Sequence, residues 1–503
     1  MSTSPRTGDR LFTGCVWLTT ATLAGIVGFT AATGLVDRMG QGWAGALVAA
    51  GLVNSWLSRV PAFWAVIAAA SPAARRWFTV GALVLLPQLV LLTIFIVDAN
   101  ASAWRSSVWR PWQSRHSCVS AYWVAAQRVN DVPNLYAETV YRTPIPPTVT
   151  RQPNLGPFFV DVFEYPPPFL PLPRLLGLVS PDFWTFRRLW FALNLAGVAV
   201  GLVAIARRLD AEAGTHATWL TPFALAAPAV VGTLQVGNVQ LLFIVMSAVA
   251  MLLFERRQHA AGGVLLGYAV ASKLFPGVLL LFLVLRRDWR AIGWTVAAGA
   301  ALTLISFIDV GWTPFAAFLE HLPKLLSGEA FPGLFRPDPI AINESVPGLV
   351  FKLGLFGVPD MGFAAAKIVG WAYTLVVVGA TAWMALGVRD RSRDPLLWVA
   401  ILLLATLRSP FLPSYAVFPP LWLATLVAAV CWHRPGIRWF AIALGLLLAF
   451  SPGQGAVPPQ LNAILTFGHT VAGLVLVGLA LRPVSTAEVV ARPSNAQGLT
   501  VPA

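Results

Sequence analysis

Long apolar segments bounded by pairs of arginine constrain this chain more than any other feature of its sequence. Segments such as 184–206, 291–310 and 364–388 can each cross a bilayer as a helix, which takes about 20 apolar residues. Only 11% of the residues are charged, whereas a soluble domain carries about 25%. The sequence therefore predicts an all-α polytopic membrane protein with about 11 to 14 transmembrane helices, and it excludes a soluble enzyme.

The chain carries 35 Lys and Arg against 21 Asp and Glu, a formal net charge of +14. In a soluble protein this excess would suggest nucleic-acid binding. Here the arginines stand in short connectors between apolar segments. If the connectors alternate between the two sides of the membrane, one topology places all of these arginines and both termini in the cytoplasm, provided that 260–286 is a hairpin that enters and leaves from the same side. We therefore expect a multi-pass protein of the cell membrane with no nucleic-acid partner. The connectors hold Arg75-Arg76, Arg207-Arg208, Arg256-Arg257, Arg286-Arg287, Arg389/Arg391/Arg393 and Arg434/Arg438.

This topology sends two long, proline-rich segments to the outside, where long loops in a compact protein are more often functional than idle. The tail of the chain is small and polar and is expected to be disordered. The predicted organisation is N-terminal transmembrane helices 1–97, a large extracytoplasmic loop 98–183, a transmembrane core 184–310 with the short hairpin 260–286, a second extracytoplasmic loop 311–363, C-terminal transmembrane helices 364–482 and a cytoplasmic tail 483–503.

Polar side chains within or beside apolar segments are costly in a membrane, so each is a candidate for binding. Gln235, Asn238 and Gln240 stand in the sequence Gln-Val-Gly-Asn-Val-Gln, where glycine and asparagine favour a tight turn between two helices. The amides can bind a polar ligand, or they can simply cap a helix. Lys273 stands at the apex of the hairpin, where it can hold a phosphate or extend to the membrane interface.

Arg408 lies at another outer junction, with Tyr415 downstream. An arginine there can pair with a lipid phosphate or with a loop carboxylate. These two residues are therefore further candidates for substrate binding.

The first long loop combines aromatic and acidic residues: Tyr122, Tyr165, Asp161 and Glu164. Such residues suit a sugar, because aromatic rings stack on its apolar face and carboxylates bind its hydroxyls. A carboxylate can also act as general base on an acceptor hydroxyl. The aromatic residues alone are equally typical of a membrane-interface belt, which leaves the two acids unexplained.

The sequence indicates no metal centre and no disulfide framework. The three cysteines are Cys15, Cys118 and Cys431, and the six histidines are scattered without a CxxC or HExxH motif. We expect no metal and no cofactor.

The order of these motifs resembles glycosyltransferase family 87, the integral-membrane mannosyl- and arabinosyltransferases of the GT-C fold. The resemblance covers roughly residues 98–432. It rests on Tyr122-Trp-Val-Ala-Ala126, Asn134-Leu-Tyr136, Tyr165-Pro-Pro, Gln235-Val-Gly-Asn-Val-Gln240, Lys273-Leu-Phe-Pro276, Asn343-Glu-Ser-Val-Pro-Gly-Leu349 and Ser409-Pro410 followed by Tyr415.

The resemblance implies a GT-C-like bundle that transfers a hexose or pentose, with mannose as the expected sugar, from a polyprenyl-phosphate donor to a lipid or glycan acceptor outside the membrane. It adds Asn343 to the expected substrate-binding residues and implies an acidic general base in the first large loop. The mechanism expected is an inverting displacement in which Lys273 and Arg408 balance the leaving phosphate. A sugar-lipid-binding protein without catalysis and a transporter or flippase are the alternatives.

The chain departs from the family pattern at the base. The family places an aspartate a few residues before the Tyr-Tyr/Trp pair, where this chain has Arg115-His-Ser-Cys-Val-Ser120. Asp161 and Glu164 are therefore the first candidates for the base, Asp131 and Asp98 the second, and His116 the third.

Overall fold

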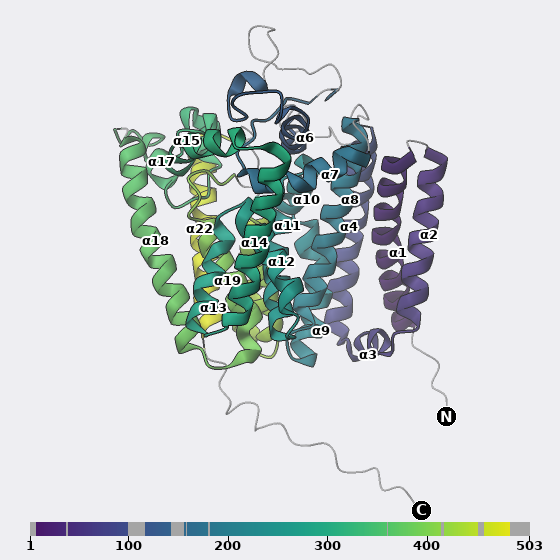
Figure 1. Cartoon of the computed structure of the whole chain (residues 1–503). Coiled ribbons are helices and arrows are strands. Elements are labelled where there is room, and N and C mark those ends of the chain that lie inside the picture. The colour runs from purple at the N-terminus through teal and green to yellow at the C-terminus, as the bar shows by residue number, and fades with distance from the viewer. Residues whose placement is uncertain are drawn as a thin grey trace, which may run out of the picture.

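The computed structural model describes residues 7–36, 39–98, 116–141, 155–156, 158–179, 182–359, 361–413, 417–450 and 457–482. Within these ranges the chain is a bundle of helices without a strand (Figure 1). Only Asn343 and Pro413 form an isolated β-bridge there. The predicted all-α polytopic membrane class is confirmed. The tail 483–503 lies outside the described residues.

Six described helices are long and apolar enough to cross a membrane: Leu11–Leu35, Pro72–Val97, Phe183–Ala206, Trp289–Val310, Gly362–Gly387 and Pro459–Leu481. A bent pair makes a seventh crossing if it is taken as one span. Its halves, α9 (Ala211–Ala226) and α10 (Pro228–Val236), meet at 61°, because a residue before proline is disfavoured in a helix. Shorter apolar helices such as Gln240–Glu255 and Phe418–Val430 account for the larger number of spans expected from the sequence.

Four helices form the N-terminal part of the bundle. Helices α1 and α2 approach each other so closely that a Cβ atom on Gly28 would lie 2.3 Å from the carbonyl oxygen of Gly45. Small residues at a crossing point allow such contact between membrane helices. Helix α1 also packs against α8. The four helices are α1 (Thr7–Val36), α2 (Met39–Ser58), α3 (Pro61–Ala69) and α4 (Pro72–Val97).

One end of the bundle, which we call the loop end, carries the described parts of both long polar segments (Figure 1). Its first part comprises α6 (Cys118–Arg128), the 3₁₀ turns η2 (Glu138–Val140) and η4 (Pro167–Phe169), and α7 (Pro171–Val179). Its second part comprises α15 (Thr313–Ser327), η6 (Pro332–Phe335), α16 (Pro337–Ala341) and α17 (Leu349–Gly354).

The central helices include a short hairpin that leaves the opposite end of the bundle and returns to it. It consists of α12 (His259–Ser272), η5 (Phe275–Gly277) and α13 (Val278–Leu285). It is packed against α14 on one side and α18 on the other. The remaining central and C-terminal elements are α8 (Phe183–Ala206), α11 (Gln240–Glu255), α14 (Trp289–Val310), α18 (Gly362–Gly387), η7 (Arg391–Arg393), α19 (Asp394–Thr406), α20 (Phe418–Val430), α21 (Pro435–Ala449) and α22 (Pro459–Leu481).

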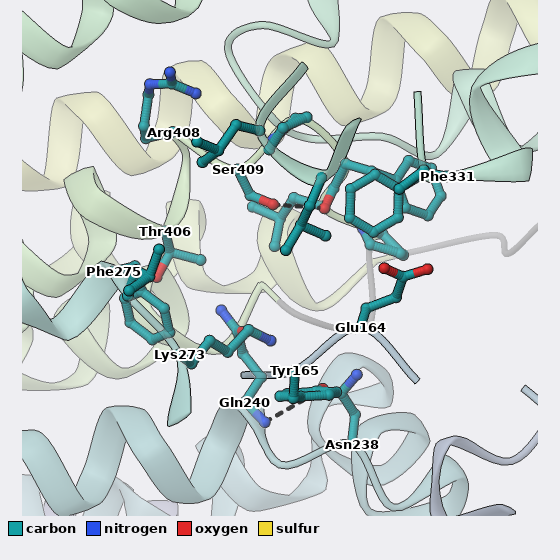
Figure 2. Close-up of a pocket in the computed structure, with 18 of the residues that line it drawn as sticks. Glu164, Tyr165, Asn238, Gln240, Lys273, Phe275, Phe331, Thr406, Arg408 and Ser409 are labelled. Carbon is teal, nitrogen blue, oxygen red and sulfur yellow. Dashed lines mark hydrogen bonds between the residues drawn. The ribbon is translucent and has the colours of Figure 1, made fainter. Parts of the chain in front are cut away.

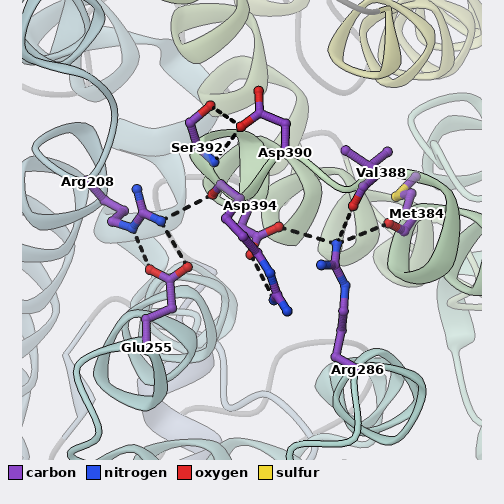
Figure 3. A network of polar contacts seen from close by, with 9 residues as sticks. Arg208, Glu255, Arg286, Met384, Val388, Asp390, Ser392 and Asp394 are labelled. Carbon is purple, nitrogen blue, oxygen red and sulfur yellow. Dashed lines mark hydrogen bonds and ion pairs between the residues drawn. The ribbon is translucent and has the colours of Figure 1, made fainter.

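The opposite end of the bundle, which we call the arginine end, holds helix termini together through arginine side chains (Figure 3). Arg208 pairs with Glu255 at 2.5 Å and donates to the carbonyl oxygen of Arg391 at 3.1 Å. Arg286 donates to the carbonyl oxygen of Val388 at 2.7 Å and lies 3.5 Å from Asp394. Cations placed on the carbonyls of a helix C-terminus satisfy groups that the helix itself leaves open.

Buried polar contacts fix the second part of the loop end to α22. His469 Nδ1 lies 3.0 Å from Glu344 Oε1, and the Thr470 hydroxyl donates to the carbonyl oxygen of Glu344 at 2.9 Å. Lys352 donates to the Thr466 hydroxyl. Buried charges are tolerated only when they are paired and hydrogen-bonded, so this group anchors the turn that follows α16.

Arg187 ties α8 to the C-terminus of α4. Its side chain is 1% exposed, and Nη1 donates to the carbonyl oxygens of Phe95 and Ile96 at 2.9 and 2.7 Å. The guanidinium also lies over the ring of Phe158, 4.5 Å from its centroid. One side chain thus joins two helices to the segment that leads into the loop end.

Replacing Arg187 with leucine removes both carbonyl contacts, and we expect a loss of about 2 to 4 kcal/mol in the free energy of unfolding. Thermal unfolding of the detergent-solubilised protein measures the change. Arg207→Leu, at an exposed position at the opposite end of the same helix, is the matched control. Equal midpoints for the two variants would contradict this role of Arg187.

Candidate active site

A cavity of about 800 Å³ opens at the loop end (Figure 2). Both long polar segments, the turn between α10 and α11, the hairpin apex and the segment after α19 contribute to its lining. Of the residues predicted from the sequence, it gathers His116, Tyr122, Asp161, Glu164, Tyr165, Asn238, Gln240, Lys273 and Arg408.

The cavity has a polar part and an apolar part. The polar part lies between α6, the segment 161–166 and the hairpin apex. The apolar part extends between α13 and α18, where side chains such as Val278, Leu281, Trp371 and Val378 line it. Trp371 and Val378 are 59% and 43% exposed, so this part opens along the apolar surface of the bundle. A lipid chain and a polar head group can therefore occupy the same cavity.

The sequence Gln-Val-Gly-Asn-Val-Gln forms the turn between α10 and α11. Gly237 adopts the left-handed conformation with φ +70°, and a Cβ atom there would lie 2.0 Å from Val119 Cγ2. Its carbonyl oxygen accepts a hydrogen bond from Trp190 Nε1 at 2.8 Å, and Asn238 Oδ1 accepts from the Gln240 N–H at 2.9 Å. Asn238 and Gln240 line the cavity, whereas Gln235 is buried in α10 away from it.

Lys273 ends α12 and lies beside two buried tyrosines. Its Nζ atom is 5.2 Å from the centroid of the Tyr165 ring, within the range of a cation–π contact. The hydroxyls of Tyr165 and Tyr122 share a hydrogen bond of 2.9 Å. The cation is thus held inside the cavity rather than extended to the membrane surface.

Glu164 and His321 form a pair at the cavity. His321 Nε2, from α15, lies 2.5 Å from Glu164 Oε2, and the His321 ring stacks on Tyr136 with centroids 5.0 Å apart. Burial raises the pKa of the Glu164 carboxyl above its usual value of 4.5, and the hydrogen bond from His321 offsets part of that rise. The side chains are 13% and 18% exposed for His321 and Glu164. A carboxylate tuned in this way suits proton abstraction.

His321 is the residue that sequence reasoning did not assign to the site. It lies 157 positions from Glu164, and no local pattern connects the two. Its place in a long polar segment was the only signal that the sequence offered.

The other candidate acids are arranged differently. Asp161 lines the cavity with its side chain 37% exposed. Asp131 is exposed in the turn after α6 and does not line the cavity, and Asp98 is exposed at the end of α4. The structure thus brings two of the four candidate acids into the cavity.

Three further predicted residues differ in their placement. Asn343 is fully buried outside the cavity lining, where Oδ1 accepts hydrogen bonds from the N–H groups of Leu412 and Ser345 at 2.8 and 3.1 Å. Arg408 lines the cavity (Figure 2), and its Nε donates to Thr374 Oγ1 of α18 at 2.7 Å. Tyr415 lies outside the described residues.

Comparison with known proteins places this arrangement in a family. The family model of glycosyltransferase family 87 matches residues 163–419, half of the chain. The chain belongs to glycosyltransferase family 87. It is therefore a membrane glycosyltransferase, and the resemblance drawn from the sequence motifs is confirmed.

A relative of this family 87 chain is the polyprenol-phosphate-mannose-dependent alpha-(1-2)-phosphatidylinositol mannoside mannosyltransferase of Mycobacterium tuberculosis (strain ATCC 25618 / H37Rv). The two are 25% identical over 358 residues, which cover 66% of this chain and 79% of the relative. No solved structure matches the chain.

Gly237→Ala is expected to destabilise the turn between α10 and α11, because the new Cβ atom collides with Val119 and the backbone keeps a positive φ. The combined cost is about 2 to 4 kcal/mol, measured by thermal unfolding in detergent. Gly293→Ala, in α14 with no atom within 4 Å of its Cβ position, is the control and should be neutral or stabilising. A neutral Gly237→Ala would contradict the close packing of this turn on α6.

Proposed function

We propose that this family 87 enzyme transfers mannose from a polyprenyl-phosphate donor to a lipid or glycan acceptor. The observation that carries the proposal is one cavity that holds a largely buried carboxylate, a lysine and an apolar opening along the bundle. The donor named for the mycobacterial relative supports the choice of mannose on a polyprenyl phosphate. The same reasoning makes the enzyme a hexosyltransferase.

The polyprenyl chain lies in the apolar part of the cavity between α13 and α18, and the phosphate lies near Lys273. The Lys273 ammonium balances charge on the phosphate as the bond to the sugar breaks. Arg408 contacts the phosphate as the donor enters from the membrane. No nucleotide is required in this scheme, because the phosphate lipid is itself the leaving group.

Glu164 acts as the general base. It takes the proton of the acceptor hydroxyl, whose oxygen attacks the anomeric carbon while the phosphate departs with the bonding electrons. The sugar configuration inverts in this single displacement. His321 positions the carboxylate and does not itself touch the substrate.

The loop end faces the extracytoplasmic side, and the arginine end and both termini face the cytoplasm. The support for this orientation is the clustering of arginine at one end of the bundle (Figure 3), which the positive-inside rule assigns to the cytoplasm. The acceptor is then glycosylated outside the cell membrane.

Glu164→Gln should lower transfer by about 10²- to 10⁴-fold, because the amide cannot accept the acceptor's proton. The assay measures transfer of radiolabelled mannose from polyprenyl-phosphate mannose in membranes, with GDP-mannose as the comparison donor. Glu320→Gln, at an exposed position next to His321 on α15, is the matched control and should keep full activity. Undiminished transfer by Glu164→Gln would refute the proposal. Transfer from GDP-mannose without transfer from polyprenyl-phosphate mannose would also refute it.

The pH dependence of transfer should follow the Glu164 carboxyl. The base must be ionised, so activity falls as the pH drops through a pKa that burial raises above 4.5. His321→Gln removes the interaction that lowers this pKa and should move the acid limb of the rate profile to higher pH. A profile measured from pH 4 to pH 8 with wild type and His321→Gln tests this. A limb that stays in place or moves to lower pH would contradict the positioning role of His321.

A further inference from the structure

Three side chains of different kinds meet at the polar part of the cavity. His116 and Cys118 stand at the start of α6, and Asp161 belongs to the segment that runs past it toward Tyr165. Their ligand atoms all lie within 4.8 Å of one another, and all three residues line the cavity. Imidazole, thiol and carboxyl are the side chains that bind zinc-like ions in proteins.

The two distances from His116 match the edges of a tetrahedral coordination shell, and the third, between Cys118 and Asp161, is within 4.8 Å. With metal–ligand distances of about 2.0 to 2.3 Å, two ligands at a tetrahedral angle are separated by about 3.3 to 3.6 Å. His116 Nε2 lies 3.5 Å from Cys118 Sγ and 3.6 Å from Asp161 Oδ2. A metal ion can therefore be placed among them with little movement of the side chains.

Neighbouring groups already orient two of these ligands. Asn238 Nδ2 donates to Cys118 Sγ at 3.4 Å, and the Val162 N–H donates to Asp161 Oδ1 at 3.2 Å, so Oδ2 faces His116. The Ser120 hydroxyl accepts from the Asp161 N–H at 2.9 Å and fixes this segment to α6. Hydrogen bonds of this kind set the direction and basicity of metal ligands.

We propose that His116 Nε2, Cys118 Sγ and Asp161 Oδ2 bind one divalent ion of the zinc class, with the fourth position open to the cavity. The thiolate and the carboxylate supply two negative charges, which neutralise the double positive charge of the ion. The ion can therefore lie in the same cavity as the Lys273 cation. A thiolate and an imidazole select zinc-class ions against Mg²⁺ and Ca²⁺, which prefer oxygen ligands. A site with three protein ligands and an open fourth position binds water or an anionic oxygen.

This site departs from the absence of a metal centre expected from the sequence. That expectation rested on spacing along the chain, whereas Asp161 is brought to His116 and Cys118 by the fold. In the proposed function, the open position would hold an oxygen of the donor phosphate. This role rests on the proposed function, whereas metal binding itself does not.

The test is metal binding by the full-length protein in detergent after removal of metal with a chelator. Zn²⁺ bound after gel filtration is measured by mass spectrometry, and Co²⁺ is added separately to detect the near-ultraviolet absorption of a cobalt–thiolate bond. Wild type should bind one ion per chain and show this absorption. Cys118→Ser should abolish the absorption, and Asp161→Asn should weaken Zn²⁺ binding by more than about tenfold.

Cys431→Ser and Cys15→Ser are the matched controls and should bind metal as wild type does. Thermal unfolding verifies that each variant is folded, and Asp161→Asn, a conservative change at a partly exposed position, keeps the test valid if Cys118→Ser does not fold. The proposal is overturned if wild type binds no zinc, if Mg²⁺ competes at equal concentration, or if the Cys118 and Asp161 variants bind like wild type.

Mannose transfer by the same preparations separates this proposal from the proposed function. If the protein binds zinc but does not transfer mannose, the metal site is supported and the proposed mannose transfer is refuted. Unchanged transfer by protein shown to be free of metal would overturn the role of the ion toward the donor phosphate.

Discussion

Docking of the segment 158–169 on the ends of the helices is the interaction on which the rest of the site depends. Phe169 is fully buried, and its ring stacks on Tyr165 with centroids 4.7 Å apart. Tyr122 contacts both rings and lies 5.1 Å from the ring of Trp190 in α8. Aromatic pairs of this kind contribute about 0.5 to 1.5 kcal/mol each beyond the burial of their area. Because this cluster holds the segment in place, Asp161 and Glu164 face a cavity instead of water.

The cost of removing charge from water explains why the two ends of the bundle differ. At the arginine end, cations pair with carboxylates or with helix carbonyls, as Arg208 and Arg286 do. These contacts complete the helix termini and need no ligand. At the loop end, Lys273 and Glu164 face the cavity, and in the proposed function the phosphate of the donor and the hydroxyl of the acceptor are their further partners.

Two carboxylate–histidine pairs show that the chemical groups of a pair do not reveal whether it stabilises the fold or belongs to a binding site. Glu344 and His469 are each 1% exposed and lie away from the cavity lining, so they serve to anchor α22. Glu164 and His321 have the same chemical groups but line or adjoin the cavity. Access to a substrate is what separates them, and access is a property of the packing.

The length of the apolar segments already determines the membrane class, and the positions of the arginines along the sequence already place them at helix ends. Glycine and asparagine in the sequence determine the turn at Gly237. These features are local, because hydrophobic length and backbone conformation depend on neighbouring residues. The family was also recognisable from the order of motifs. Tertiary packing alone decided which of the four candidate acids line the cavity, Asp161 and Glu164 rather than Asp131 and Asp98. It also decided the pairing of Glu164 with His321 and the buried position of Asn343. Those contacts join residues far apart in the chain, and their energies depend on burial and on partners that no local pattern encodes.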